Sequence, residues 1–271
     1  TPLQLAASRN NVKLVKLMLK RRAAVNAPAS GIGGRTALQA AVESGSAGLV
    51  EILITAGSDL NAAASPNSGY TALQAACKSN NIELARKLIS LGADVNAAPS
   101  PINGRTCLQE VARKGHSELV RILLDSGAEV NAAGAAKYGF TALQAAARAG
   151  HLSVVNMLLA AGADVHAPAA ERGYSAISAA VMRNDLEMGD IDLIEVLLNA
   201  GADIEAYAPT DNSRTALQDA AQRGNTNVVR FLLERGANCN AYAADSKEAT
   251  ALQAAAIGGN LQITFMLLKA G

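Results

Sequence analysis

Apolar residues recur along the chain in short stretches that have the spacing of one face of an α-helix. Residues 119–124 read Leu-Val-Arg-Ile-Leu-Leu, and residues 228–233 read Val-Val-Arg-Phe-Leu-Leu. Side chains three and four positions apart lie on the same side of a helix, so this spacing gives each stretch one apolar side. The pattern therefore predicts a series of short helices that each bury one side.

A second motif, Thr-Ala-Leu-Gln-Ala-Ala with small changes, precedes each apolar stretch. It starts at Thr1, Thr36, Thr71, Thr106, Thr141, Ser175, Thr215 and Thr250. Successive starts are 35, 35, 35, 35, 34, 40 and 35 residues apart, so eight repeats fill the chain. A Thr followed three residues later by Gln is a capping box, whose two side chains bond free N–H groups at a helix start. Its second half is Gln4, Gln39, Gln74, Gln109, Gln144, Gln218 and Gln253, with Ser178 as the exception.

Residues that tolerate a left-handed backbone mark the ends of the predicted helices. Nine residues after each motif start, the chain has Gly45, Gly115, Gly150, Gly224 and Gly259, or Asn10, Asn80 and Asn184. The apolar stretches end at Gly57, Gly92, Gly127, Gly162, Gly201, Gly236 and Gly271. Arg22 replaces this glycine in the first repeat, at a cost of about 1 kcal/mol. Each repeat is thus predicted to be two helices joined by a tight turn.

The repeated start, the Leu-rich second helix and the Gly-Ala-Asp-Val-Asn segment after it resemble the ankyrin repeat. The match covers all eight repeats and nearly every signature position. The resemblance implies an all-α solenoid, a stack of helix–loop–helix repeats joined by extended, β-hairpin-like fingers. We call the stretch between a second helix and the next Thr a finger. We expect one ankyrin repeat domain over residues 1–271, as part of a longer protein.

Two features depart from the family pattern. The repeats exceed the usual length of about 33 residues, with the extra residues in the fingers, as in residues 98–103. Gln also stands where the family usually has His, and Gln does not titrate near neutral pH. This variant is similar to the long Thr-Ala-Leu-Gln ankyrin arrays of filamentous-fungal multidomain proteins, in which the array often accompanies an effector domain.

Composition supports a thin stack more than one large core. Hydrophobic residues make up 50% of the chain, yet aromatic residues only 3%, with no Trp. A net charge of +1 implies no general attraction to nucleic acid or membranes, and no apolar run approaches the roughly 18–20 residues that span a bilayer. Three scattered cysteines do not suggest a disulfide framework. We therefore expect an intracellular, cytoplasmic protein, with the nucleus left open.

No pattern in the sequence points to catalysis, a cofactor or a metal. Residues 31–34 are glycine-rich but lack the Gly-Lys-Ser/Thr ending of a phosphate loop. His116, His151 and His166 have no partner at metal-ligand spacing. The acidic insertion at residues 182–192 does not follow an EF-hand pattern, so we interpret it as a solvated loop in preference to a calcium loop.

The three cysteines have no catalytic base that the sequence can place beside them. Cys77 stands where other repeats have Ala, and Cys239 where they have Val, so both are expected to be small buried apolar residues. Cys107 follows a Thr cap, and we expect it to be more exposed.

The resemblance implies that fingers and first helices line one concave face, on which a partner would bind. Two sets of positions should lie there: the residue before each Thr, and the residues seven and eight after it. Arg and Tyr are frequent in binding hot spots. Tyr207 and Tyr242, two residues past the finger acid or Asn, add two more rings. The candidate partner-binding residues are Arg35, Tyr70, Lys78, Arg105, Arg113, Lys114, Phe140, Arg148, Tyr174, Arg183, Tyr207, Arg214, Arg223 and Tyr242.

This basic, ring-bearing face predicts a protein or peptide partner, with an acidic extended or helical segment as the sharper hypothesis. A protein-binding face of unspecified chemistry stays open beside it. Nucleic acid is disfavoured because the domain is nearly neutral. A further alternative is a regulatory or self-associating array that controls an adjacent effector domain, because neither end has a polar cap and copies could stack end to end.

Overall fold

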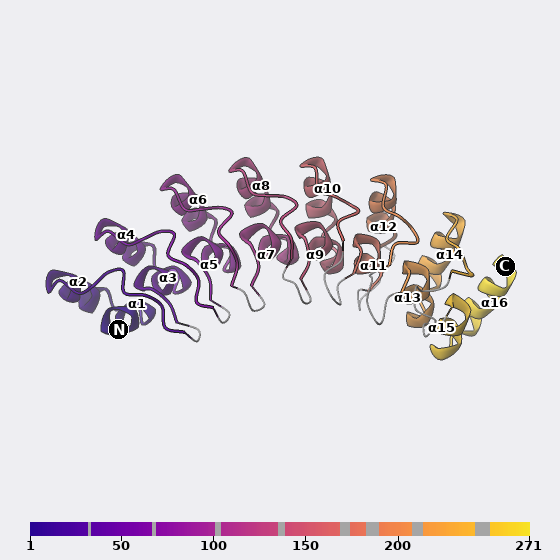
Figure 1. Ribbon diagram of the computed structural model, residues 1–271, viewed down its shortest axis with the longest axis horizontal. Coiled ribbons are helices and arrows are strands. Elements are labelled where there is room, and N and C mark those ends of the chain that lie inside the picture. The colour runs from indigo at the N-terminus through magenta and orange to yellow at the C-terminus, as the bar shows by residue number, and fades with distance from the viewer. Residues whose placement is uncertain are drawn as a thin grey trace. The chain divides into compact units, whose positions relative to one another are not determined.

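A computed structural model describes residues 1–31, 34–66, 69–100, 104–134, 139–168, 174–182, 190–207, 214–241 and 250–271. These residues form sixteen α-helices and no strand, so the prediction of an all-α solenoid of ankyrin repeats is confirmed (Figure 1). Backbone contacts divide the chain into two compact units, residues 1–111 with 116–129, and residues 112–115 with 130–271. The expectation of one domain over the whole chain stays a prediction.

Each repeat contributes a short first helix and a second helix of nine or ten residues. The first helices are α1 (Pro2–Ser8), α3 (Ala37–Glu43), α5 (Ala72–Lys78), α7 (Cys107–Lys114), α9 (Ala142–Ala149), α11 (Ala176–Val181), α13 (Ala216–Arg223) and α15 (Ala251–Ile257). The second helices are α2 (Val12–Lys20), α4 (Ala47–Thr55), α6 (Ile82–Ser90), α8 (Ser117–Asp125), α10 (Leu152–Ala160), α12 (Asp190–Asn199), α14 (Thr226–Glu234) and α16 (Leu261–Ala270).

Within each compact unit the helices form two layers. First helices pack on first helices, as α1 does on α3 and α13 on α15, while second helices such as α14 and α16 contact each other behind them. The contact surfaces are made of Ala and Leu: Ala41 and Ala76 are fully buried, and so are Leu53 and Leu88. Small Ala side chains let neighbouring helices approach closely, and that close packing takes the place of bulky rings.

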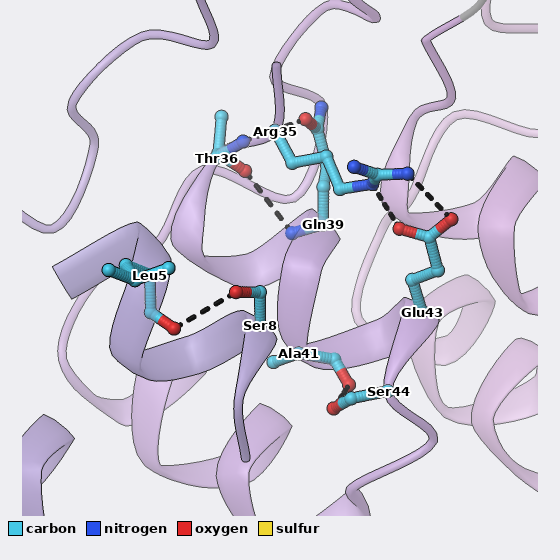
Figure 2. Close-up of polar contacts among 8 residues, drawn as sticks. All are labelled: Leu5, Ser8, Arg35, Thr36, Gln39, Ala41, Glu43 and Ser44. Carbon is cyan, nitrogen blue, oxygen red and sulfur yellow. Dashed lines mark hydrogen bonds and ion pairs between the residues drawn. The ribbon is translucent and has the colours of Figure 1, made fainter. Parts of the chain in front are cut away.

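The predicted capping boxes are present, and five of the glutamines make a further bond that the motif did not reveal: Gln4, Gln39, Gln74, Gln144 and Gln218. Thr36 N–H donates to Gln39 Oε1 at 2.9 Å, and Gln39 N–H donates to Thr36 Oγ1 at 3.2 Å (Figure 2). The remaining amide group, Gln39 Nε2, donates to the carbonyl oxygens of Ala62 and Ala63 at 2.9 and 3.2 Å. One buried side chain therefore fixes both the helix start and the middle of the following finger.

Asparagines in the fingers join successive repeats. Asn61 Nδ2 donates to the Gly92 carbonyl oxygen at 3.1 Å, and Asn61 Oδ1 accepts from the Asp94 N–H at 2.8 Å. Asn26, Asn96 and Asn131 make the same pair of bonds to their own next repeats. An amide is required here because it must both donate and accept. We call this series of contacts the asparagine ladder.

The helix ends follow the predicted backbone conformations. Asn10, Arg22 and Asn80 have φ of 52°, 61° and 54°, in the left-handed region, alongside the glycines at equivalent positions. Asn184 lies outside the described residues.

The expectation that Cys107 is exposed is wrong. Its side chain is 1% exposed, as are Ala37 and Ala72 at the same place in their repeats. The first helical position faces inward in each of these repeats, and the caps Thr36 and Thr71 are themselves buried, so a residue beside the Thr cap is covered. Cys77 is fully buried, and Cys239 is only half-buried.

Replacing a capping glutamine should destabilise the fold. Gln74 is 3% exposed and bonds Thr71 N–H and the Ala97 carbonyl oxygen, so Gln74→Ala leaves buried backbone groups without partners. We expect the free energy of unfolding to fall by about 2–3 kcal/mol. Urea denaturation followed by circular dichroism measures it. Gln262→Ala, on the exposed surface of α16, is the matched control and should change stability by less than about 0.5 kcal/mol. Equal effects of the two changes would contradict the role of the capping glutamine.

Candidate partner-binding face

The structure brings the two predicted sets of residues into contact with each other. The residue before each Thr ends a finger, and the residue eight positions later lies at the end of the first helix. Tyr70 and Lys78 are such a pair, with Lys78 Nζ 4.1 Å from the centre of the Tyr70 ring. A cation over the face of an aromatic ring is attracted by the ring's negative face. Members of the two sets therefore lie against each other in pairs within single repeats.

Three of the predicted arginines are engaged within the chain. Arg35 forms an ion pair with Glu43, the residue eight positions later (Figure 2). Arg214 donates to Gln222 at the equivalent spacing. Arg105 Nη1 lies 3.6 Å from Glu110 Oε2. The sequence analysis assigned these three arginines to a partner, but each already contacts a side chain of the chain itself.

Glu110 and Asp219 are buried acids that the sequence analysis missed. They are 6% and 5% exposed, and both stand where other repeats have a buried alanine such as Ala40 or Ala75. A buried carboxylate needs a compensating charge or donors, and Arg105 supplies one for Glu110. Comparing equivalent positions across the repeats would have identified both acids as departures.

A cluster of two rings and one cation lies in the second compact unit. The Phe140 and Tyr174 rings are nearly parallel, with an interplanar angle of 12° and centroids 6.3 Å apart. The Arg148 Cζ atom, at the end of α9, lies 5.2 Å from the Phe140 centroid and 5.3 Å from that of Tyr174. Both rings are half-buried and Arg148 is exposed. Two successive repeats thus position one cation at the surface.

Arg148 differs from Arg35 and Arg105 in its electrostatic surroundings. No carboxylate of the described residues forms an ion pair with it, whereas Arg35 and Arg105 each contact a glutamate. The two rings restrict its side chain without neutralising its charge.

A family model of ankyrin repeats in three copies matches residues 3–99, 97–169 and 177–271. The chain belongs to the ankyrin repeat family. Ankyrin repeats in general are non-enzymatic modules for protein–protein interaction. A comparison with curated proteins found no match to this sequence.

The remaining predicted residues are spread along the ankyrin repeats. Arg113 is exposed and Lys114 half-buried in the last turn of α7, and Arg223 Nη2 contacts Met182 Sδ at 3.3 Å. Tyr207 is 45% exposed in the finger that follows α12. Arg183 and Tyr242 lie outside the described residues.

The histidine and acidic candidates show no metal site in the part of the chain that is described. No three His, Cys, Asp or Glu side chains there could hold one metal ion together. His151 Nε2 lies 3.2 Å from the Arg113 carbonyl oxygen, which gives that ring a structural contact between repeats. Residues 183–189 of the acidic insertion lie outside the description. Among the described residues, no helix is long and apolar enough to cross a membrane.

Cys77 and Cys107 meet in the core between adjacent repeats. A hydrogen bond with the Cys77 thiol, and then burial, raise the pKa of the Cys107 thiol well above its usual value. The thiolate is the nucleophilic form of cysteine, so a raised pKa and burial both suppress reactivity. Cys107 is therefore suited to filling space and not to covalent chemistry.

Thiol alkylation of the native protein should follow this difference in environment. We expect iodoacetamide at pH 8 to modify the half-buried Cys239 first, and Cys107 at least about tenfold more slowly. Peptide mass spectrometry of samples quenched over time measures each site. In urea all three thiols should react at similar rates, which provides the control. Fast native modification of Cys107 would contradict its placement in the core.

Proposed function

We propose that the ankyrin repeats bind a protein partner through the face formed by fingers and first helices, and that the partner presents an acidic segment there. The observation that carries this proposal is Arg148, an exposed cation positioned by two aromatic rings, with no carboxylate of the described residues in ion-pair contact. A carboxylate that joins Arg148 gains a charge-assisted hydrogen bond to an already restricted side chain.

Other cations of the face are expected to contribute less. Arg35, Arg105 and Arg214 already contact side chains of the chain, so a partner would compete with Glu43, Glu110 or Gln222 for them. Lys78 on the Tyr70 ring repeats the ring–cation arrangement in the first compact unit. The roles of Arg113, Lys114, Arg183, Tyr207, Arg223 and Tyr242 stay predictions.

Charge reversal at Arg148 should abolish capture of acidic ligands. Peptides selected from a random display library on the 271-residue chain should be rich in Asp and Glu. For one such peptide, Arg148→Glu should weaken binding at least about thirtyfold, as loss of a hot-spot residue does. Fluorescence anisotropy measures the affinity, which should also decrease with added salt.

Arg230→Glu is the matched control, because Arg230 is an exposed arginine of α14 in the same compact unit. The double variant Phe140→Leu/Tyr174→Leu keeps the charge and removes both rings, so an intermediate loss of affinity is expected. Phe231→Leu, which removes a ring near Arg235, controls for loss of an aromatic residue as such. Selected peptides without acidic residues, or equal binding by the Arg148→Glu and Arg230→Glu variants, would refute an acidic partner.

Self-association is the second candidate function, and one observation favours it. Ile257, Leu261, Phe265 and Leu268 of the last two helices are 68%, 68%, 63% and 60% exposed. Neighbouring exposed apolar side chains of this size often mark an interaction surface. A second copy of the chain is the occupant we propose for it. Control of an adjacent effector domain stays a prediction.

The concentration dependence of the molecular mass tests self-association. We expect the mass from sedimentation velocity to rise over about a hundredfold range of protein concentration. Phe265→Asp should restore the monomer, whereas Gln262→Asp on the same helix should not. A mass that stays monomeric throughout would exclude this candidate.

A further inference from the structure

The positive charge of the chain is concentrated in its first repeat. Residues 1–35 contain seven of the 24 lysines and arginines and no aspartate or glutamate, which leaves 17 cations against 23 acids in the remainder. The net charge of +1 is therefore the sum of +7 in the first repeat and −6 in the rest. Such a separation creates a local electrostatic potential that the total charge does not show.

Five of these cations lie on α2 or directly after it. Lys13, Lys16 and Lys20 are three and four residues apart, so they form one row along the helix, and Arg21 and Arg22 follow at its end. All five side chains are exposed, and none forms an ion pair with a carboxylate of the described residues. We call these five residues the basic row. It belongs to the layer of second helices (Figure 1).

The exposure of the basic row does not depend on its place in the stack. Glu83, Arg86 and Ser90 occupy the positions of its three lysines in α6, and all three are exposed although α6 has a repeat on either side. A neighbouring ankyrin repeat therefore leaves these positions open. In α6 the charges have both signs, and Arg86 pairs with Glu118 at 3.3 Å. The basic row differs in having one sign throughout.

Folding alone does not explain the basic row. Like charges three and four residues apart weaken a helix, and Lys13 lies in the first turn, where the helix dipole disfavours a cation. Arg22 has a left-handed φ of 61°, where the equivalent residues Gly57 and Gly92 have no side chain to strain the backbone. The dipole favours only the cations at the helix end, such as Lys20. Several costs to folding are thus accepted on one charged surface.

The neighbouring residues indicate which anionic partner fits the basic row. No aromatic residue precedes Tyr70 in the sequence, so the first repeat has no ring on which a nucleic-acid base could stack. Leu17 lies four residues after Lys13 and three before Lys20, on the same side of α2, and it is 52% exposed. Lysines beside an exposed leucine on one helix are typical of helices that lie on anionic bilayers.

We propose that the basic row binds the surface of a bilayer that contains anionic lipids. The cations lie among the lipid phosphate and carboxylate groups, and Leu17 enters the interface between them. Each cation near such a surface strengthens binding about fivefold, so five cations suffice for reversible attachment without a helix that crosses the bilayer. This inference goes beyond the proposed function, because it uses none of the residues proposed to bind a protein partner.

Vesicle co-sedimentation of the 271-residue chain tests the proposal. Vesicles of phosphatidylcholine with about one-third phosphatidylserine should bind the chain at least about tenfold more tightly than phosphatidylcholine alone, and added salt should release it. Equal binding to both kinds of vesicle would overturn the proposal. Duplex DNA and a polyglutamate peptide are the soluble polyanions for comparison. Binding of either one as tightly as the anionic vesicles would also overturn it, because the basic row would then belong to a soluble partner.

Neutralising the row should remove vesicle binding without unfolding the chain. Lys13→Gln/Lys16→Gln/Lys20→Gln changes exposed side chains only, and it should weaken binding at least about thirtyfold. Circular dichroism checks that the helices are retained.

A matched control removes the same charge from other second helices. Arg121→Gln/Arg230→Gln/Lys269→Gln alters exposed cations of α8, α14 and α16 at positions equivalent to Lys16 and Lys20. This variant should bind anionic vesicles within about threefold of the unaltered chain, because the lost charges lie outside the row. Equal losses in the two triple variants would overturn the proposal, since net charge and not the basic row would then determine binding.

Arg22→Gly separates binding from folding. It restores the residue of the other repeats and relieves the left-handed backbone, so the midpoint of urea unfolding should stay the same or rise. Vesicle binding should nevertheless weaken about threefold to fivefold. A weaker binder that is at least as stable supports a role of Arg22 in binding. Unaltered vesicle binding by both Arg22→Gly and the triple lysine variant would overturn the proposal.

Discussion

One glutamine side chain in each regular repeat holds together the parts on which the rest of the structure depends. Gln74 Oε1 accepts from Thr71 N–H, where one finger ends, and Gln74 Nε2 donates to the carbonyl oxygen of Ala97 in the middle of the next finger. Two fingers are thereby attached to the start of the same short helix. Because seven residues of helix give little stability alone, this attachment and the packing of Ala and Leu against neighbouring helices hold the element in place.

The same attachment explains the surface on which a partner is proposed to bind. The residue before each Thr is held close to the first helix, so its side chain meets the end of that helix. This produces the Arg35–Glu43 ion pair and the contact of Lys78 with Tyr70. In these repeats the chemistry of the proposed binding surface therefore depends on two side chains eight positions apart.

Most of the fold could be predicted from the sequence because its signals are local. Capping boxes, left-handed turns at Asn10 and Asn80, and apolar helix faces are each set by residues within a few positions. The wrong expectation for Cys107 was based on its neighbour in sequence, the Thr cap. The equivalent residues of other repeats, Ala37 and Ala72, predict burial instead. In a repeat protein the equivalent position is the better guide.

The candidate site was less predictable because it depends on distances between side chains. The sequence placed Arg35, Arg105 and Arg148 in one class, yet only the structure separates the two that contact glutamates from the one that lies against two rings. Glu110 needed a comparison with alanines elsewhere.

The sixth repeat gives up contacts that the other repeats keep. Ser178 lacks the bond of a glutamine amide, His166 does not continue the asparagine ladder, and Glu205 satisfies only one of its oxygens. In a stack where each repeat is stabilised chiefly by its neighbours, such losses weaken one interface and leave the others intact. The regular repeats, by contrast, are explained by packing and capping alone.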